Sequence, residues 1–490
     1  MAHLLSKSTY MKGRQCPKAL WLYKHMRELR TEADPLKQAI FETGTEVGLL
    51  AQQLFPGGVD CSPPTHLEFE QSVADTQAAI ARGERVIYEA AFLRDDVLAA
   101  MDILVLTDEG WKAYEVKGST NVKEPYLHDA ALQCHVIAGS IALADVSIVH
   151  LNNRYVKQGP VDVHGLFTIT SVKALVDREL PEVPARIEAL KAVVQAPEAP
   201  VVAIGPQCDS PYPCDFKAHC WAHVPERSVF ELTNASSKKW ALYERGIFRM
   251  ADIPEEEPLS GAQRRQVDAW KTGGTAVDRN ALRSWLDALR YPVHHLDFET
   301  MNAAVPRYDG ARPFQQVPFQ YSLHIQSAPG ADPDHREFLP EGGEDPRKAL
   351  LRHLLSDIGP TGDILAYYAP FERMVLRALA RDVPEHAQAI EALLPRIKDL
   401  MDPFGKGWYY APEMNGSNSI KSVLPALVPA MQYTDLAIRE GGTASLRFGQ
   451  LSAGTYTGDA AQLREDLLAY CKMDTLAMVR VLGVLCEFGA

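Results

Sequence analysis

The stretch MDILVLTDEGWKAYEVKG, residues 101–118, sets the architecture that we expect for the N-terminal half of the chain. Two runs rich in Val, Ile, Leu, Tyr and Trp flank a turn at residues 109–110, which predicts a β-hairpin. With a two-residue loop, the register sets Asp102 opposite Lys117. Because side chains alternate faces along a strand, Glu115 and Lys117 share a face, and we expect Asp102 to join them.

This predicted group of two carboxylates and a lysine has a chemical meaning. Two carboxylates hold a divalent cation, and the cation lowers the pKa of a bound water. A lysine beside them orients that water or stabilises charge on a phosphoryl group. A helix is expected near residues 128–140, with Asp129 and Gln133 on one face and Gln133 placed to position substrate or water. The alternative is a surface hairpin with a salt bridge worth about 0–1 kcal/mol.

Length and composition limit the classes of protein without choosing among them. The 490 residues suffice for two or three domains of about 100–200 residues each. The net charge of −13 argues against a basic nucleic-acid coat but not against a nuclease, which gathers carboxylates around metal ions. No apolar run approaches roughly 18 residues, and the N-terminus lacks the apolar core of a signal peptide. We therefore expect a cytoplasmic protein with no membrane partner.

A second notable stretch is CDSPYPCDFKAHC, which places Cys208, Cys214 and Cys220 at equal intervals. The whole chain has only 8 cysteines. In a reducing compartment, clustered cysteines are more often metal ligands or redox groups than disulfides.

A third group of residues lies in the C-terminal half. In HHLDFETMN, residues 294–302, Asp297 and Glu299 stand two apart on a predicted buried strand and face the same side. Buried acids are costly unless they are paired or bind metal, which indicates a metal role. Glu372 follows in YYAPFE, where an acid would also stabilise the first turn of a helix through the helix dipole. Asp399 and Asp402 are the reserve candidates for its place.

The last motif lies in the predicted amphipathic helix DLLAYCKMDTLAMVRVL, where Tyr470 and Asp474 are one turn apart on one face. Before it, the loop NGSNSIKSVLPAL brings Lys421 near a predicted helix start. The two alternatives are that backbone N–H groups at this helix start bind a phosphate, or that the loop forms an ordinary N-cap. His324, in a predicted strand, is expected to be packed or at the surface rather than catalytic.

Two resemblances connect these motifs. The order Asp102, Glu115-Val116-Lys117, Gln133 resembles the PD-(D/E)XK nucleases of the RecB-like group, and more narrowly the CRISPR-associated RecB-like exonucleases and AddB-type helicase nucleases. The resemblance implies a restriction-endonuclease-like α/β domain and an iron–sulfur cluster held by one cysteine before the nuclease core and three after it. Cys16 precedes the core here.

The resemblance thus implies a [4Fe–4S] cluster on Cys16, Cys208, Cys214 and Cys220. Zinc is the alternative, with His219 as a possible replacement for one thiolate, and unliganded core cysteines are a third reading. The chain departs from the family pattern in the even cysteine spacing. It also lacks the histidine that often follows a glycine in an early helix, where residues 44–48 read GTEVG, with Glu46 as a possible substitute.

The second resemblance is to the DnaQ-like exonucleases, RNase H-fold enzymes that use four acids and two metal ions. It implies that Asp297, Glu299, Glu372 and Asp474 bind Mg²⁺ or Mn²⁺ and that Tyr470 orients the attacking water.

Together the motifs and resemblances predict an α/β protein of three parts, a prokaryotic fusion of two nuclease types. Residues 1–225 form a RecB-like domain, 226–288 a helical linker that faintly resembles a helix–hairpin–helix, and 289–490 a DnaQ-like domain. The predicted function is a metal-dependent DNA exonuclease acting on single-stranded ends, with two candidate centres. The alternatives are an RNase and an iron–sulfur nucleic-acid-binding protein with one or both centres degenerate. The sequence indicates no particular protein partner.

Overall fold

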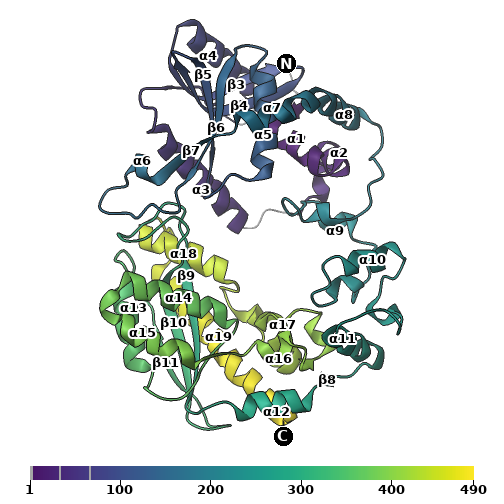
Figure 1. Ribbon diagram of the computed structural model, residues 1–490, viewed down its shortest axis with the longest axis vertical. Coiled ribbons are helices and arrows are strands. Elements are labelled where there is room, and N and C mark those ends of the chain that lie inside the picture. The colour runs from purple at the N-terminus through teal and green to yellow at the C-terminus, as the bar shows by residue number, and fades with distance from the viewer. Residues whose placement is uncertain (1–3, 32–34, 64, 66–67, 490) are drawn as a thin grey trace. The chain divides into compact units, whose positions relative to one another are not determined.

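The structure, a computed structural model, describes residues 4–31, 35–63, 65 and 68–489 (Figure 1). The chain divides into two compact units, Met1–His223 with Ala304–Phe314, and Val224–Ala303 with Gln315–Ala490. Each unit combines helices with a mixed β-sheet, which confirms the α/β class. Within the described residues, no helix has the length and apolar character needed to span a membrane.

The first unit is built on a sheet in the order β2-β3-β4-β5-β6-β7, with β1 added alongside β4. β4 is antiparallel to both of its neighbours, β3 and β5, whereas β2 and β3 are parallel and β5 and β6 are parallel. Parallel strands need a crossover connection, and α5 (Glu124–Ile137) supplies it. The strands are β1 (Leu5–Ser6), β2 (Val59–Asp60), β3 (Val86–Arg94), β4 (Val97–Thr107), β5 (Gly110–Lys117), β6 (Leu143–Leu151) and β7 (Phe167–Ser171).

Helices cover both faces of this sheet. On one face, a core of small and branched side chains joins the sheet to α5 and its neighbours. On the other face, Val47 and Ala51 of α3 (Pro35–Gln52) pack against Tyr88, Ile103 and Tyr114. The helices of the first face are α1 (Lys7–Gln15), α4 (Phe69–Ala81), α5, α7 (Lys173–Glu179) and α8 (Val183–Gln195), and α2 (Pro17–His25) packs on α8.

The predicted hairpin forms, but its register differs from the expected one. Thr107 pairs with Gly110, so the turn residues are 108–109. Gly110 has a φ of 117°, a conformation that favours glycine, and this lets the second strand begin one residue earlier than expected. The register therefore points Asp102 toward Glu115, not Lys117. Because the shift is two residues, it leaves every side chain on its expected face.

The second unit contains a sheet in the order β11-β10-β9-β12-β13. β9, β10 and β11 are antiparallel, and β12 and β13 run parallel to β9. The strands are β9 (Val293–Met301), β10 (Val317–Gln326), β11 (Asp334–Phe338), β12 (Ile364–Ala366) and β13 (Ile397–Asp399). A separate pair joins β8 (Ala276–Val277) to β14 (Tyr409–Tyr410).

Alternation along β9 separates a packed face from a functional face. Leu296 and Phe298 enter the core shared with α13 (Arg347–Asp357), α14 (Ala369–Asp382) and α15 (Ala387–Leu393). Asp297 and Glu299 project to the opposite face, where α18 (Gly441–Ala453) and α19 (Ala460–Gly489) contact β9. The long helix α19, yellow in Figure 1, runs beside β9 and β10.

Residues 226–288, which we expected to form a linker between two domains, cluster with the second unit. They contain α10 (Lys238–Glu244), α11 (Gly261–Thr272) and α12 (Arg279–Asp287). The segment after Gly246 is a 3-10 turn, η5 (Met250–Asp252), where a helix–hairpin–helix would need its second α-helix. The faint resemblance to that motif therefore does not extend to the backbone.

Candidate metal centres

The first candidate centre lies where β4 and β5 meet α5. Lys117 Nζ is 2.7 Å from Glu115 Oε1 and 2.7 Å from Asp129 Oδ2. Asp102 Oδ2 accepts a 2.6 Å hydrogen bond from the backbone N–H of Val116. The structure thus brings together the acids and the lysine that the hairpin pattern singled out.

Gln133 has a different place from the one expected. Its Nε2 donates to Glu115 Oε2 and to the carbonyl of Ala100, both at 2.7 Å, and its side chain is fully buried. The amide therefore orients Glu115 from behind and is not presented to a substrate. Asp129 and Gln133 lie one turn apart on α5, so one helix face positions both Lys117 and Glu115.

Two residues of this centre were missed in the sequence. Lys7, at the start of α1, places its Nζ 2.7 Å from Glu115 Oε1 and 3.8 Å from Asp129 Oδ2. Glu89 stands on β3 between the pairs Tyr88–Ile103 and Ala90–Met101, and so opposite Asp102. An acid inside the apolar run VIYEAAFLR was a signal for Glu89, whereas nothing local marks Lys7.

Glu89 also marks an irregularity in the sheet. Its φ of 51° is rare for a residue other than glycine. Strict alternation along β4 would place Met101 and Leu104 on opposite faces of the sheet. Both side chains pack on the α5 side, so the alternation of the β3–β4 pair is interrupted at this point. Asp102 lies at the change, and its carboxylate turns sideways to the backbone of β5.

The carboxyl groups of this centre differ in their pKa values. Burial, with Glu115 nearby, raises the pKa of Asp102 to about 8, and burial raises the pKa of Glu89 to about 7. Burial alone would also raise the pKa of Glu115, but the ammonium groups of Lys117 and Lys7 hold it well below its usual value. Near neutral pH, Glu115 is thus ionised, Asp102 is largely protonated and Glu89 is near the midpoint of its titration, so a bound cation would displace protons from this centre.

The second candidate centre lies between β9 and α19. Ligand atoms of Asp297, Glu299 and Cys471 all lie within 4.8 Å of one another. Asp474 Oδ1 accepts a 2.6 Å hydrogen bond from the Tyr433 hydroxyl. The Cys471 thiol lies 3.8 Å from Asp297 Oδ2.

These acids are buried with little positive charge to balance them. Burial and the neighbouring acids Asp474, Glu299 and Glu372 raise the pKa of Asp297 well above its ordinary value. Burial raises the pKa of Glu299 to about 8, that of Glu372 to about 8 and that of Asp474 to about 6. Glu372 Oε2 is buried without a hydrogen-bond partner. Buried carboxylates in this state suit a divalent cation, because the ion supplies the charge that they lack.

The two reserve candidates for the place of Glu372 have partners close by in the chain. Asp399 accepts hydrogen bonds from the backbone N–H groups of Tyr368 and Ala369 at 3.0 and 3.1 Å, which fixes the start of α14. Asp402 pairs with Lys406 at 2.9 Å. Both reserve acids are thus engaged in local structure.

Lys421 and two tyrosines border the second centre. The Lys421 Nζ lies 5.5 Å from the ring centroid of Tyr470 and 5.7 Å from that of Tyr433. The Tyr470 hydroxyl also interacts with Asp474, so Tyr433, which the sequence did not suggest, and Tyr470 both support one carboxylate. His324 is packed, as expected, with its Nδ1 2.8 Å from Thr475 Oγ1.

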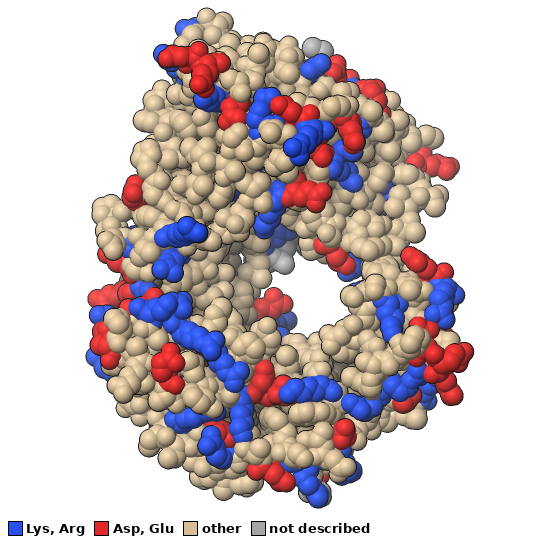
Figure 2. All heavy atoms as spheres, in the orientation of Figure 1, with Lys and Arg blue, Asp and Glu red and all other residues tan. Residues whose placement is uncertain are grey.

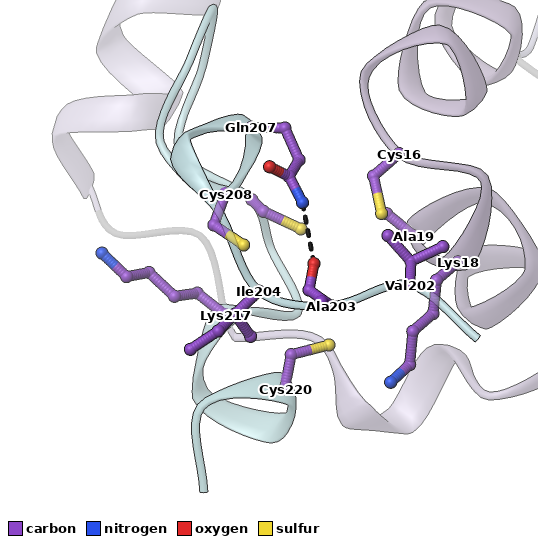
Figure 3. A pocket seen from close by; sticks show the side chains of 11 residues that line it. Cys16, Lys18, Ala19, Val202, Ala203, Ile204, Gln207, Cys208, Lys217 and Cys220 are labelled. Carbon is purple, nitrogen blue, oxygen red and sulfur yellow. Dashed lines mark hydrogen bonds between the residues drawn. The ribbon is translucent and has the colours of Figure 1, made fainter. Parts of the chain in front are cut away.

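The third candidate centre joins the four cysteines. Cys16 lies between α1 and α2, Cys208 in η3 (Pro206–Cys208), Cys214 in the following loop and Cys220 at the end of α9 (Lys217–Cys220). All four line one pocket with Lys18, Ala19, Val202, Ala203, Ile204, Gln207 and Lys217. In Figure 3 the sulfur atoms of Cys16, Cys208 and Cys220 face this space. His219, the possible replacement for one thiolate, is not among the residues that line this pocket.

The spacing of the thiols bears on what they hold. Among the described residues, Asp297, Glu299 and Cys471 form the group whose ligand atoms all lie within 4.8 Å of one another. The cysteine sulfurs of the pocket form no such group, so they are spread more widely. A single zinc with Zn–S bonds of about 2.3 Å would bring tetrahedral sulfurs to about 4 Å from one another. Four thiols around one pocket are the ligand set of either a tetrahedral zinc or an iron–sulfur cluster.

Comparison with known proteins covers part of the chain. Residues 294–419 match a family described as a domain of unknown function (DUF2779), a match that begins just before Asp297 and passes Glu372. The chain is 25% identical over 232 residues to the uncharacterized protein MG366 homolog of Mycoplasma pneumoniae, covering 44% of this chain and 35% of that protein. It is 26% identical over 211 residues to the uncharacterized protein UU173 of Ureaplasma parvum, covering 38% and 30%. The chain spans about a third of the length of these curated relatives, and their names state no activity.

The raised pKa values predict that metal binding to the second centre depends on pH. Protonated Glu299 and Glu372 contribute stability that is present below about pH 4 and lost as pH rises through about 8, and the pKa of Asp297 is raised in the same direction. Mg²⁺ or Mn²⁺ should therefore raise the melting temperature of the metal-free protein more at about pH 8 than at about pH 5.5. Differential scanning fluorimetry of wild type and Asp297→Asn measures this. Equal shifts at both pH values, or an undiminished shift in the variant, would argue against the centre.

The cysteine pocket predicts a bound cluster. Protein purified without oxygen should contain iron and acid-labile sulfide in equal amounts, and Cys220→Ser should lose both. Cys486→Ser, which changes a half-buried cysteine of α19 outside the pocket, is the matched control. Stoichiometric zinc in colourless wild-type protein would exclude an iron–sulfur cluster.

Proposed function

We propose that this protein is a metal-dependent nuclease that hydrolyses phosphodiester bonds at single-stranded DNA ends and has two hydrolytic centres. One observation carries the proposal. In the second unit, Asp297, Glu299, Glu372 and Asp474 come from three separate elements; the last three are buried and Asp297 is half-buried, with Lys421 as the cation that borders them. Such an arrangement is costly for a fold and is explained by a need for cations.

In the first centre, the protein positions its acids before any substrate arrives. Lys7, Lys117 and Gln133 fix the two oxygens of Glu115, and Val116 fixes Asp102. Divalent cations bound there would lower the pKa of a water and neutralise phosphoryl charge. Lys117 is the residue placed to stabilise negative charge that develops on the phosphate oxygens.

In the second centre, Tyr470 is placed to orient the attacking water, since it borders Asp474 from the same helix. Lys421, over the rings of Tyr470 and Tyr433, is placed to contact a phosphate of the substrate strand. Figure 2 shows basic side chains mixed with acidic ones on both units, so the net charge of −13 does not exclude contacts to phosphates.

The four cysteines support a structural cluster in the first unit. Cys16 precedes β2 to β7 and the other three cysteines follow them, so a cluster there would close a loop of nearly the whole unit. A cross-link across a long loop restricts the unfolded chain most. We therefore propose that a [4Fe–4S] cluster stabilises the fold of the first unit and that the carboxylates carry out hydrolysis.

A second candidate function is nucleic-acid binding by a protein whose first centre is degenerate. The specific observation is that no histidine follows Gly44 or Gly48 on α3, and Glu46, the substitute, is exposed. Lys7 also occupies an oxygen of Glu115 that a cation would use. An RNase remains the third candidate, since discrimination rests on contacts to the 2′-hydroxyl.

The proposal predicts cleavage of labelled single-stranded DNA in Mg²⁺ or Mn²⁺, tested beside single-stranded RNA. Lys117→Ala and Asp297→Ala should each lower the rate of their own centre by at least about 10²-fold, because each removes charge stabilisation or a metal ligand. Glu198→Ala, which changes an exposed acid outside both centres, is the matched control and should keep wild-type activity. Loss in only one variant means one working centre. Wild type that binds but cuts neither polymer supports the binding protein, and cleavage of RNA alone supports the RNase.

A further inference from the structure

Cys471 is a fully buried cysteine that lies beside the acids of the second candidate centre. Its Sγ is 3.8 Å from Asp297 Oδ2 and 4.0 Å from the Asp297 carbonyl oxygen. Two other buried cysteines, Cys61 and Cys134, belong to the hydrophobic core on the α5 side of the first sheet. Cys471 differs from them because its sulfur lies against a carboxylate.

Helix α19 brings this sulfur to the acids. Cys471 precedes Asp474 by three residues, so the two side chains share one face of the helix. The helix contacts β9, which carries Asp297 and Glu299. The sulfur and one oxygen from each of these two acids all lie within 4.8 Å of one another. Two elements far apart in the sequence thus present three atoms that can bind a metal to one small space.

The Glu299 carboxylate has no partner in this space. Its side chain is 7% exposed, and among the described residues none donates a hydrogen bond to it. On the α18 side it faces Gly441, which offers no side-chain donor. A buried carboxylate without a partner is costly, and a cation between Glu299, Asp297 and Cys471 would satisfy it.

The separation of sulfur and oxygen suits two ligands of one ion. A tetrahedral ion with bonds of about 2.0–2.3 Å holds a sulfur and an oxygen ligand about 3.6 Å apart. The 3.8 Å between Cys471 Sγ and Asp297 Oδ2 is close to this value. A thiol adds no negative charge to the neighbouring acids until an ion binds and deprotonates it.

We propose that Cys471 is a metal ligand of the second centre and that its sulfur makes this centre favour a thiophilic divalent ion, such as Zn²⁺ or Co²⁺, over Mg²⁺. Soft thiolate ligands suit zinc, whereas carboxylates and water suit magnesium and manganese. The inference rests on the proposed function and specifies which ion its second centre selects. Asp297 and Glu299 supply the oxygen ligands of the same ion.

The test compares how tightly each protein binds two ions. Full-length protein, purified without oxygen so that its cysteine pocket keeps what it binds, is titrated with Zn²⁺ or Mg²⁺, and the rise in melting temperature gives the half-saturating concentration. Cys471→Ser should raise the half-saturating Zn²⁺ concentration by at least about 10-fold, because even changes beside a metal ligand cost about 10- to 100-fold in affinity. The value for Mg²⁺ should stay the same or fall, since the serine hydroxyl offers an oxygen.

A matched control and a direct location of the ion complete the test. Cys486→Ser changes a half-buried cysteine of the same helix outside the centre and should alter neither concentration. Crystals of wild type soaked in Zn²⁺ should show an anomalous peak about 2.3 Å from the Cys471 sulfur. In crystals of Cys471→Ser the peak at this place should be weaker or absent.

Opposite shifts for Zn²⁺ and Mg²⁺ support the sulfur ligand, because a damaged fold would weaken the binding of both ions. If Cys471→Ser loses both ions, the distance in the wild-type crystals decides. Equal half-saturating Zn²⁺ in wild type and variant, or a zinc ion on Asp297 and Glu299 more than about 3 Å from the sulfur, would overturn the inference and leave the nuclease proposal intact. If neither ion binds the second centre of wild type, the proposed function loses that centre and the inference fails with it.

Discussion

Carboxylates buried side by side repel one another and lose their hydration, and this cost shapes both units of the protein. In the second unit the acids come from β9, α14 and α19, elements far apart in the sequence. Burial and mutual repulsion keep protons on them near neutral pH, as the raised pKa values of Asp297, Glu299 and Glu372 indicate. A fold that gathers such groups without enough cations has a site that a divalent ion would stabilise.

In the first unit, lysine side chains offset part of the cost of burying carboxylates. Lys7 and Lys117 keep Glu115 ionised, whereas Asp102 and Glu89 are left with raised pKa values. The left-handed backbone of Glu89 coincides with the point where the β3–β4 pair changes faces, so local strain and charge gather at one place. Helix α1 carries Lys7, which contacts Glu115, at its start, and Cys16 of the cysteine pocket directly follows its end.

Much of this could be predicted from the sequence because the signals are local. The hairpin, the two acids on β9 and the one-turn spacing of Tyr470 and Asp474 follow from the periods of strand and helix. The register was wrong by two residues because Gly110 starts its strand with positive φ. Lys7 and Tyr433 were missed because their partners lie far away in the sequence, where no pattern of spacing points to them. Gln133 was found, but its buried bond to Glu115 depends on packing.

The most direct test of whether these clustered acids bind metal is anomalous diffraction from crystals grown with Mn²⁺. We predict manganese peaks among Asp297, Glu299, Glu372 and Asp474, and beside Asp102 and Glu115, that disappear after chelation. A well-ordered map at saturating Mn²⁺ with no anomalous density at either place would show that these buried acids do not serve to hold metal, and the nuclease proposal would fall.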